Sequence, residues 1–473
     1  MQKITKKIAV GMMTLLFIFG FAPNVFAATA YSVGTLYAPG TNHAGDDFRQ
    51  NVTNARNAYA LISDISSYYN HQPTYTYVNS TTRLGNSRVF FINGHSNNLY
   101  ITLGYANTTE GRTGVSIYTN GWTSGSGYKT AGLDSRSMSG TTLITFVGCE
   151  TAGYVGNPTN LTDKAVNKGA KVALGWYHTI HSRVYNGPQW LVSYNGGLGG
   201  GLSVINSIYR AKVAWPSSDL SDFYAYRGNR DLTIGTSTQP LSAGVSMSSI
   251  ATNYDEQKNV RSHNEALQLI SDTYKVVDTS IMELKPINKV IRNEELSNYT
   301  TLFSDIIDKI KTQDSSFNPN DYKVTYHVAN DEDGYGDIYF RYYIDGKIET
   351  NKVYIATFDN FKITDIVLGG VTIANMGNVK NISMNNINAK IATFENNKTE
   401  LLLEKAGNMF HTTKKANLVK TDNKVDISSL KGNIIELEES YFYDYNTKEL
   451  KYLLKTVENI DGLYDAGGIE IAL

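Results

Sequence analysis

Long apolar runs are missing from this sequence except for one at its start. The run from Ile8 to Ala22 follows a basic segment with three lysines and precedes the helix-breaking Pro23. It is too short for a comfortable membrane span and lacks a stop-transfer flank. Residues 25–27 (Val-Phe-Ala) fit the small-x-small rule for signal peptidase. We therefore expect residues 1–27 to be a signal peptide and the mature chain to be secreted, with an uncleaved anchor as the alternative.

An excess of either charge is also missing. Lys and Arg number 43 against 44 Asp and Glu, so the formal net charge is −1. This balance argues against nucleic acid or an anionic membrane surface as the main partner. We see no convincing repeat of 20–50 residues. The 33 tyrosines and 40 glycines suggest a chain rich in strands and turns, and the Lys, Asn and Ile usage of its later part is typical of a bacterial protein.

Cysteine is almost absent, because Cys149 is the only one in the chain. A lone cysteine excludes an internal disulfide. Outside the cell, a thiol at the protein surface that has no function is prone to oxidation. Cys149 is therefore either buried and inert or kept for its reactivity, and the count alone does not separate the two interpretations.

Residues 28–240 alternate between strand and helix patterns, which predicts an α/β sandwich with a mainly parallel sheet. Short apolar runs predict strands at 31–37, 74–78, 88–92, 99–103, 114–118, 142–147 and 171–176. Apolar residues at helical spacing predict helices at 46–69, 161–168 and 188–214, the last interrupted by the glycines of 196–201.

The composition changes after a Thr-, Ser- and Asn-rich segment at 241–262, which we interpret as a linker. From residue 263 to the end, Lys, Asp, Glu and Asn rise and Gly falls, and the pattern predicts an α+β accessory or regulatory region. Helices are expected at 265–276 and 299–312, and strands at 323–328, 337–344, 352–358, 363–368 and 450–457, with a strand-turn-strand unit at 441–454.

Two of the predicted buried strands end in reactive side chains. His95 follows the strand at 88–92, and Cys149 follows the strand at 142–147. In open parallel sheets, ligands bind outside the carboxyl ends of the strands. If the two strands are neighbours, both side chains face one cleft. An imidazole there can take the thiol proton and later protonate a leaving amine, as acyl transfer requires.

A strand ending in Gly94-His95, followed by a strand ending in Gly148-Cys149-Glu150-Thr151, resembles the caspase-like cysteine peptidases. That group includes caspases, gingipains, clostripain and bacterial caspase-like domains. The segment 167–176 resembles the helix, turn and strand that follow the nucleophile in this group. The resemblance covers residues 31–235 and implies a caspase-like α/β/α sandwich.

The resemblance also implies residue roles. Cys149 would be the nucleophile and His95 the general acid and base. Backbone N–H groups of Cys149 and of the residue after the histidine would form the oxyanion hole. That residue is usually glycine in the group and is Ser96 here. Gly94 and Gly148 allow sharp exits from the strands and close approach of a substrate backbone.

The residues of the substrate pocket are less clear from the sequence. Val147 stands two positions before the nucleophile, where some relatives place a polar or acidic residue, and it gives no support for a basic-residue specificity. Asp46 and Asp47 could reach the pocket, but we favour their capping of the first helix. Trp176 and His178 are further pocket candidates, with core packing as the alternative for the tryptophan.

Metal sites are weakly indicated. His178 and His181 could bind a metal or replace His95, yet a third ligand is missing from their neighbourhood in the sequence. The acidic segment 331–337 resembles part of a calcium loop without its final Glu, and we favour a hairpin turn there. We expect no metal and no organic cofactor.

These features together predict a secreted cysteine endopeptidase that acts on protein or peptide substrates through an acyl-thioenzyme. The alternatives are a caspase-like binding or sensor module without turnover and a surface adhesion protein. We expect no nucleic acid partner and no membrane attachment after signal cleavage. Intramolecular regulation, in which residues 263–473 cover the cleft, is a further hypothesis.

Overall fold

A computed structural model gives the structure of this protein. It describes residues 28–37, 43, 45–104, 112–153, 159–239, 246–249, 274–277, 282–284, 300–371, 375, 383–409, 420–421, 424–425 and 434–473. The expected signal peptide lies outside the described residues. Of the predicted linker, Ser246–Ser249 form a short strand, β11, paired with β12 (Tyr274–Val277).

The first part of the chain contains a six-stranded sheet of order β10-β9-β8-β3-β1-β2, in which β10 alone is antiparallel to its neighbour. Its strands are β1 (Ala28–Val33), β2 (Ile65–Asn70), β3 (Val89–Asn93), β8 (Leu143–Val147), β9 (Val172–Trp176) and β10 (Tyr224–Gly228). Three of them, β3, β8 and β9, are buried along their whole length, which explains their continuous apolar runs. The predicted α/β class with a mainly parallel sheet is confirmed.

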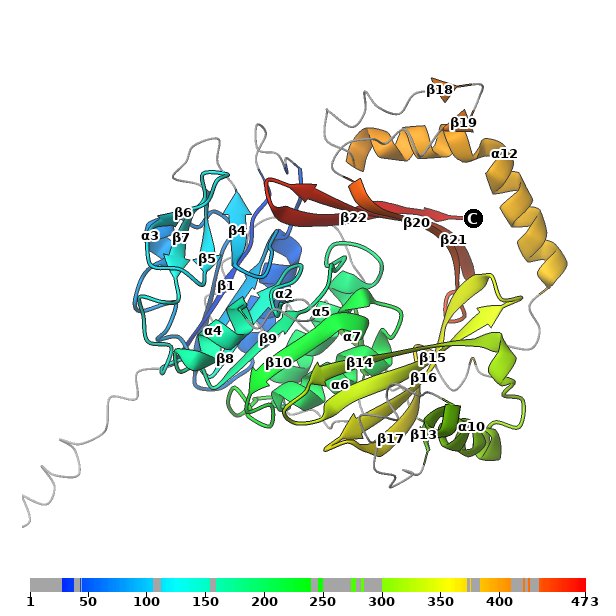
Figure 1. Ribbon diagram of the computed structural model, residues 1–473, viewed down its shortest axis with the longest axis horizontal. Coiled ribbons are helices and arrows are strands. Elements are labelled where there is room, and N and C mark those ends of the chain that lie inside the picture. Colours follow the sequence, from blue (N-terminus) through cyan, green and yellow to red (C-terminus); the bar gives the residue numbers. More distant parts are fainter. Residues whose placement is uncertain are drawn as a thin grey trace, which may run out of the picture.

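Both faces of this sheet are covered (Figure 1). One face packs against α2 (Arg49–Tyr59), α5 (Gly187–Gly199) and α6 (Val204–Ala214). The other face packs against α4 (Leu161–Asn167) and a small sheet of order β4-β5-β7-β6. The strands of that sheet are β4 (Tyr100–Gly104), β5 (Arg112–Ser116), β6 (Trp122–Thr123) and β7 (Lys129–Gly132).

Two predicted elements in this part are wrong. The helix expected over 46–69 ends at Tyr59, and Ile65–Asn70 form edge strand β2 instead. Their apolar spacing is helical, but pairing with β1 satisfies the backbone of this Ser- and Tyr-rich segment. The strand expected at 74–78 is a single helical turn, α3 (Tyr75–Val78), because the Thr74 side chain accepts the N–H of Tyr77 and caps it.

The predicted long helix over 188–214 is two helices. α5 continues through most of the glycines, which lie buried against α2 and α6, and the chain turns at residues 200–203 before α6. The Ser203 side chain accepts the N–H of Asn206 and caps α6. Small residues on α5 therefore allow close helix packing.

The C-terminal region is mainly sheet and agrees with the α+β expectation only in outline. One sheet contains β13 (Met282–Leu284), β14 (Tyr322–Asn330), β15 (Tyr335–Ile344), β16 (Ile348–Asp359), β17 (Lys362–Gly369), β20 (Ile434–Asp444), β21 (Glu449–Ile460) and β22 (Leu463–Ala472). The start of β16 pairs with β20 and its end pairs with β17. Helices α10 (Thr300–Gln313) and α12 (Met384–Met409) pack beside it.

Strands were predicted in the right places for β14 to β17 and for β21, whereas α12 and β22 were not predicted. Residues 274–277, at the end of the helix expected over 265–276, form strand β12, and the rest of that helix lies outside the described residues. Residues 331–334 of the acidic segment form the turn between β14 and β15, as favoured from the sequence, and residues 335–337 begin β15.

The C-terminal sheet is fastened to the first part of the chain by buried polar contacts. Lys212 of α6 is fully buried, pairs with Asp337 of β15 and donates to Thr357 at 2.8 Å. Tyr224 donates to the same Asp337 at 2.6 Å, and Arg230 binds both carboxylate oxygens of Asp359 at 2.6 Å. These contacts hold the two parts in a fixed relation.

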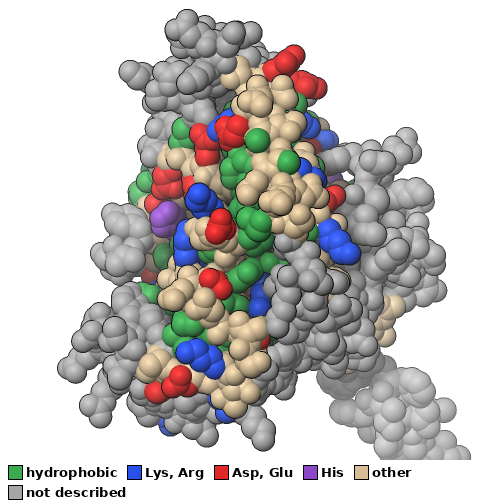
Figure 2. All heavy atoms as spheres, turned by 90° about the vertical axis from the view of Figure 1, so that its right-hand side faces the viewer, with side chains coloured by type: hydrophobic (Ala, Val, Ile, Leu, Met, Phe, Trp, Pro, Cys, Tyr) green, Lys and Arg blue, Asp and Glu red, His purple; other side chains and the backbone are tan. Residues whose placement is uncertain are grey.

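None of the helices that the structure describes combines the length and apolar composition needed to cross a bilayer. On the face shown in Figure 2, side chains of both charge signs alternate with apolar ones along the described surface. A polyanion would find no concentrated basic stripe on that part of the face.

Candidate functional site

The carboxyl ends of β3 and β8 bring His95 and Cys149 to one edge of the sheet. The two strands are parallel neighbours, and Asn93 pairs with Val147 in register. His95 and Cys149 each come two residues after this pair, so the chain leaves both strands at the same level. The Asn93 side chain donates to the Val147 carbonyl at 2.8 Å and ties the two exits together. The expectation that the two strands are neighbours is confirmed.

A fixed turn holds Cys149. Glu150, which follows it, has a φ of 57°, a left-handed conformation that is uncommon for a residue other than glycine and stores about 1–3 kcal/mol. The Glu150 N–H donates to the His178 carbonyl at 3.0 Å. The Thr151 hydroxyl contacts the Phe146 carbonyl at 2.9 Å and accepts the Trp176 N–H at 3.1 Å. The turn is therefore fastened to both β8 and β9.

Gly148 has no side chain because its neighbours leave no room for one. A Cβ there would lie 2.2 Å from the Ser96 Oγ and 2.8 Å from the Gly94 carbonyl oxygen. This closeness lets the Ser96 hydroxyl donate to the Cys149 carbonyl at 2.7 Å. Ser96 thus joins the loop after His95 to the turn that carries Cys149.

His95 is held in place by a carboxylate. Its Nε2 lies 2.9 Å from the Asp46 Oδ2, and its ring packs edge-on against Tyr37 and Phe48. Only 3% of His95 is exposed. A hydrogen bond from Nε2–H to Asp46 leaves Nδ1 as the basic nitrogen. The predicted helix-capping role of Asp46 is therefore wrong, because its carboxylate faces His95 and not the helix end.

A second carboxylate reaches the site from the far end of the chain. Asp465 of β22 lies 3.8 Å from Nδ1 of His95 and 3.4 Å from Nδ1 of His43. Arg183 donates to Asp465 at 2.7 Å and also pairs with Asp46. One guanidinium thus joins the two carboxylates on either side of the His95 ring.

The titration behaviour of this cluster follows from its burial and charges. Burial and the charge interaction with Asp46 oppose the charged form of Asp465, but His95, Arg183 and His43 outweigh them and hold the pKa of Asp465 at about 2. Burial and the neighbouring His95 lower the pKa of His43 to about 4. At neutral pH Asp465 is therefore a carboxylate, Arg183 is charged and His43 is neutral.

The Cys149 thiol is shielded in this structure. Only 4% of Cys149 is exposed, and its Sγ accepts the Ile180 N–H at 3.4 Å. Burial, together with the charge of Asp465, raises the pKa of the thiol to about 12. Reaction at this sulfur requires a rearrangement that exposes it, because only 4% of Cys149 is exposed.

The donor atoms of His43, Asp46, His95 and Asp465 lie within 4.8 Å of one another, close enough to surround a cation. Arg183 already binds both carboxylates of this group. Since a guanidinium supplies the positive charge that a metal would supply, the cluster fits a metal poorly. We therefore derive no step through a metal ion.

Other predicted pocket residues lie in the core or elsewhere. Val147 and Trp176 are fully buried in the main hydrophobic cluster, and the indole of Trp176 donates to the Leu220 carbonyl at 3.1 Å. Asp47 pairs with Arg49 and accepts its backbone N–H at 3.0 Å, so it does support the start of α2.

His178 and His181 do not meet in one site. His178 stacks on Phe223 and contacts the Thr179 hydroxyl at 2.9 Å. His181 is buried and contacts Asp219 at 2.5 Å. The geometry places neither of them in the position that His95 holds beside Asp46.

Three residues of the cluster were missed from the sequence: His43, Arg183 and Asp465. His43 follows the first strand and precedes Asp46 by three residues, a spacing that could have suggested a pair at the same sheet edge. Arg183 lies in the loop after β9, also at that edge. Asp465 lies more than 300 residues from Cys149 in the sequence, and nothing local to it indicates this position.

A comparison with protein-family models and with curated proteins finds no match for this chain, so a function has to be inferred from the side chains described above.

Proposed function

We propose that this protein is a cysteine endopeptidase of the caspase-like kind, with Cys149 as nucleophile and His95 as general acid and base. The observation that carries the proposal is the shared exit of His95 and Cys149 from adjacent parallel strands, with Asp46 fixing the imidazole. Counted in chain order, the strands of the sheet have the doubly wound order 2-1-3-4-5 with an antiparallel sixth strand. Asp46 and His95 lie at the switch point between β1 and β3, and Cys149 follows the next strand, β8.

The chemistry follows from the His95 tautomer. Nδ1 takes the proton of the Cys149 thiol, and the thiolate attacks the carbonyl carbon of a peptide bond. Backbone N–H groups of Cys149 and Ser96 stabilise the oxyanion. His95 then gives its proton to the leaving amine, and an acyl-thioenzyme remains. Water, deprotonated by His95, hydrolyses the thioester and restores the thiol.

Asp46 favours this cycle because its carboxylate stabilises the imidazolium form that arises after the first proton transfer. Because Cys149 is buried and the tip of the β21–β22 hairpin lies beside His95, the test uses the native chain and a Leu463→Asp chain, in which a new charge enters an apolar site of the hairpin tip. Both are treated with iodoacetamide and with a peptide acyloxymethyl ketone, and the adduct is mapped by mass spectrometry.

The proposal predicts rapid, pH-dependent labelling of Cys149 in at least one of the two chains, and loss of that labelling in His95→Ala. Glutathione serves as the reference for an ordinary thiol. Labelling of Cys149 no faster than glutathione in both chains, together with an intact mixed peptide library, would favour a binding module or an adhesion protein.

A further inference from the structure

The β21–β22 hairpin inserts its tip into the site as an extended strand. The Tyr464 N–H donates to the Ser96 carbonyl at 3.0 Å, and the two residues form an antiparallel bridge. The Asn97 side chain donates to the Gly462 carbonyl at 2.8 Å. Figure 1 shows this red hairpin reaching across to the blue and cyan elements of the first part of the chain. Such backbone pairing beside the catalytic histidine is how an extended peptide binds to a strand edge.

Two side chains of the tip, Leu463 and Asp465, contact the first part of the chain at an apolar site and at Arg183. Leu463 is fully buried among Tyr37, Phe48, Tyr100 and Tyr128, an apolar site. Two residues later, the Asp465 carboxylate binds Arg183, which also donates to the Ala466 carbonyl at 3.3 Å. Successive side chains of a strand point to opposite faces, so Leu463 and Asp465, two residues apart, lie on the same face of β22.

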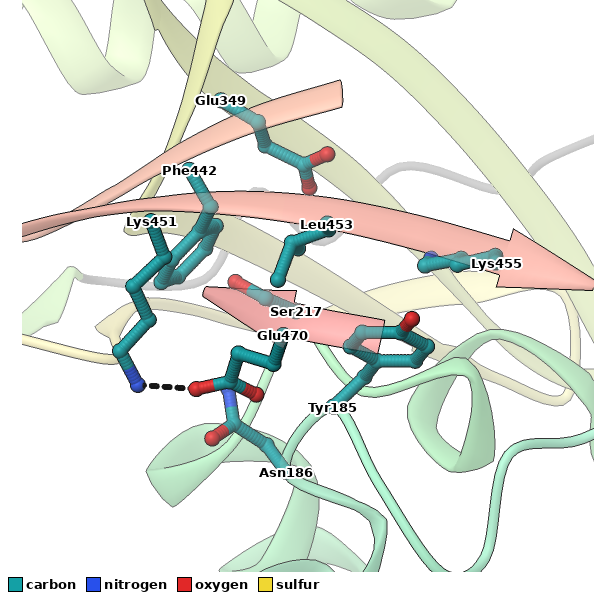
Figure 3. A pocket seen from close by; sticks show the side chains of 9 residues that line it. All are labelled: Tyr185, Asn186, Ser217, Glu349, Phe442, Lys451, Leu453, Lys455 and Glu470. Atoms are coloured by element: carbon teal, nitrogen blue, oxygen red, sulfur yellow. Dashed lines mark hydrogen bonds and ion pairs between the residues drawn. The ribbon is translucent and has the colours of Figure 1, made fainter. Parts of the chain in front are cut away.

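The base of the hairpin is anchored separately. The Tyr185 hydroxyl donates toward the carbonyl of Leu454 in β21 and lies 3.1 Å from that of Ile469 in β22. Figure 3 shows Tyr185 beneath these strands, at one end of a pocket that also contains the Lys451–Glu470 pair. That pocket holds neither His95 nor Cys149. The hairpin is thus held at its base by Tyr185 while its tip contacts the loop that follows His95.

We propose that residues 463–466 occupy the substrate cleft as an internal substrate mimic, and that Arg183 selects an acidic side chain in the position that Asp465 holds. This inference rests on the proposed function, because it names the regulation and the substrate class of the same site. Intramolecular regulation would then act through residues 463–466 and the Arg183–Asp465 pair.

The charges of the cluster favour an acidic side chain in that position. Without Asp465, Arg183 still balances Asp46, but the part of the guanidinium that bound Asp465 and the Ala466 carbonyl loses its partners. A substrate carboxylate would restore these charge-assisted bonds. A basic side chain would meet the guanidinium as a like charge, which disfavours its binding.

The test compares five full-length chains: native, Leu463→Asp, Asp465→Asn, Leu463→Asp/Arg183→Gln and the control Glu470→Gln. Glu470 lies on the same strand, and its pair with Lys451 is exposed. Each chain is labelled with peptide acyloxymethyl ketones that carry Asp, Asn, Leu or Arg beside the reactive group. Thermal melting shows whether each chain is folded, and Asp465→Asn serves if Leu463→Asp does not fold.

The inference predicts that Leu463→Asp and Asp465→Asn label at least about tenfold faster than the native chain, because a buried charge pair or apolar contact that holds the tip is lost. Glu470→Gln should label like the native chain. The Asp ketone should react fastest, and Arg183→Gln in the Leu463→Asp background should remove that preference.

Equal labelling of the native and Leu463→Asp chains would overturn the occupancy of the cleft while leaving the peptidase in place. Fastest labelling by the Arg or Leu ketone would overturn the acidic preference. If no chain labels at Cys149 faster than glutathione, both the inference and the proposed function fall.

Discussion

At the scale of single residues, the site depends on how His95 is held. Asp46 fixes Nε2, so that Nδ1 faces the space that Asp465 now fills. The sequence predicted His95 and Cys149 because each follows a strongly apolar strand. It could not assign Asp46, because an acidic residue before a helix is usually expected to cap that helix. In the structure its carboxylate instead contacts His95, 49 residues away in the sequence.

Asp46→Asn in the Leu463→Asp background should lower kcat by about 100-fold to 10,000-fold, since an amide can hold the imidazole in the wrong tautomer. KM should change much less, and the acid limb of the pH profile should shift. Asp47→Asn is the matched control, because that side chain pairs with Arg49 and lies outside the cluster. If both variants act alike, Asp46 is not a positioning residue.

The pH dependence of Cys149 alkylation offers a second check at this scale. Burial and the Asp465 charge raise the thiol pKa to about 12, and Glu150 adds to this while Arg183 opposes it. The native fold, in which the thiol is buried, therefore favours the neutral thiol. The stability that this contributes to the fold is fully present below the ordinary pKa near 9 and is lost as pH rises toward 12. We expect the iodoacetamide rate of the native chain to keep rising above pH 9, and that of Leu463→Asp to level off at lower pH. Superimposable profiles would contradict this account of the shielding.

At the scale of elements, buried parallel strands were predictable and edge elements were not. β3, β8 and β9 are short apolar runs with no competing pattern. β2 and α3 were misassigned because their residues fit more than one structure and the neighbouring elements decided between them. The β21–β22 turn was not predicted; in the structure Asp461 and Gly462 both have positive φ, as a two-residue hairpin turn requires.

The turn after β8 is the element on which the nucleophile depends. Thr151→Val keeps the shape but removes the hydroxyl that accepts the buried Trp176 N–H. We expect a loss of about 1–3 kcal/mol in the free energy of unfolding, measured by urea titration, because that N–H is left without a partner. Thr312→Val, at an exposed helix position, is the control and should change stability far less. A Thr151→Val chain as stable as the native one would show that the hydroxyl does not hold the turn.

At the scale of the whole molecule, the C-terminal region packs against the first part of the chain, and its β21–β22 hairpin reaches the site. Lys212 and Asp337 are both fully buried where α6 meets β15. The sequence does not predict that they form an ion pair, because they lie on elements from different regions. Each of them, taken alone, would be expected at the surface. The relation between the two regions was for this reason left open by the sequence.

Lys212→Met should lower the free energy of unfolding by about 3–5 kcal/mol, because it leaves the Asp337 carboxylate buried without its cation. The double variant Lys212→Met/Asp337→Leu should recover part of the loss. Lys347→Met, in an exposed turn, is the control. Urea unfolding of the three chains checks this, and a double variant less stable than Lys212→Met would contradict the importance of the unpaired charge.

The most direct measurement of the central claim is the hydrolysis of a mixed peptide library by the Leu463→Asp chain, with new termini identified by mass spectrometry. The account predicts cleavage that follows acidic residues, disappears in Leu463→Asp/Cys149→Ala and falls by about 1,000-fold or more in Leu463→Asp/His95→Ala. An intact library, or cleavage that persists after Cys149→Ala, would contradict it.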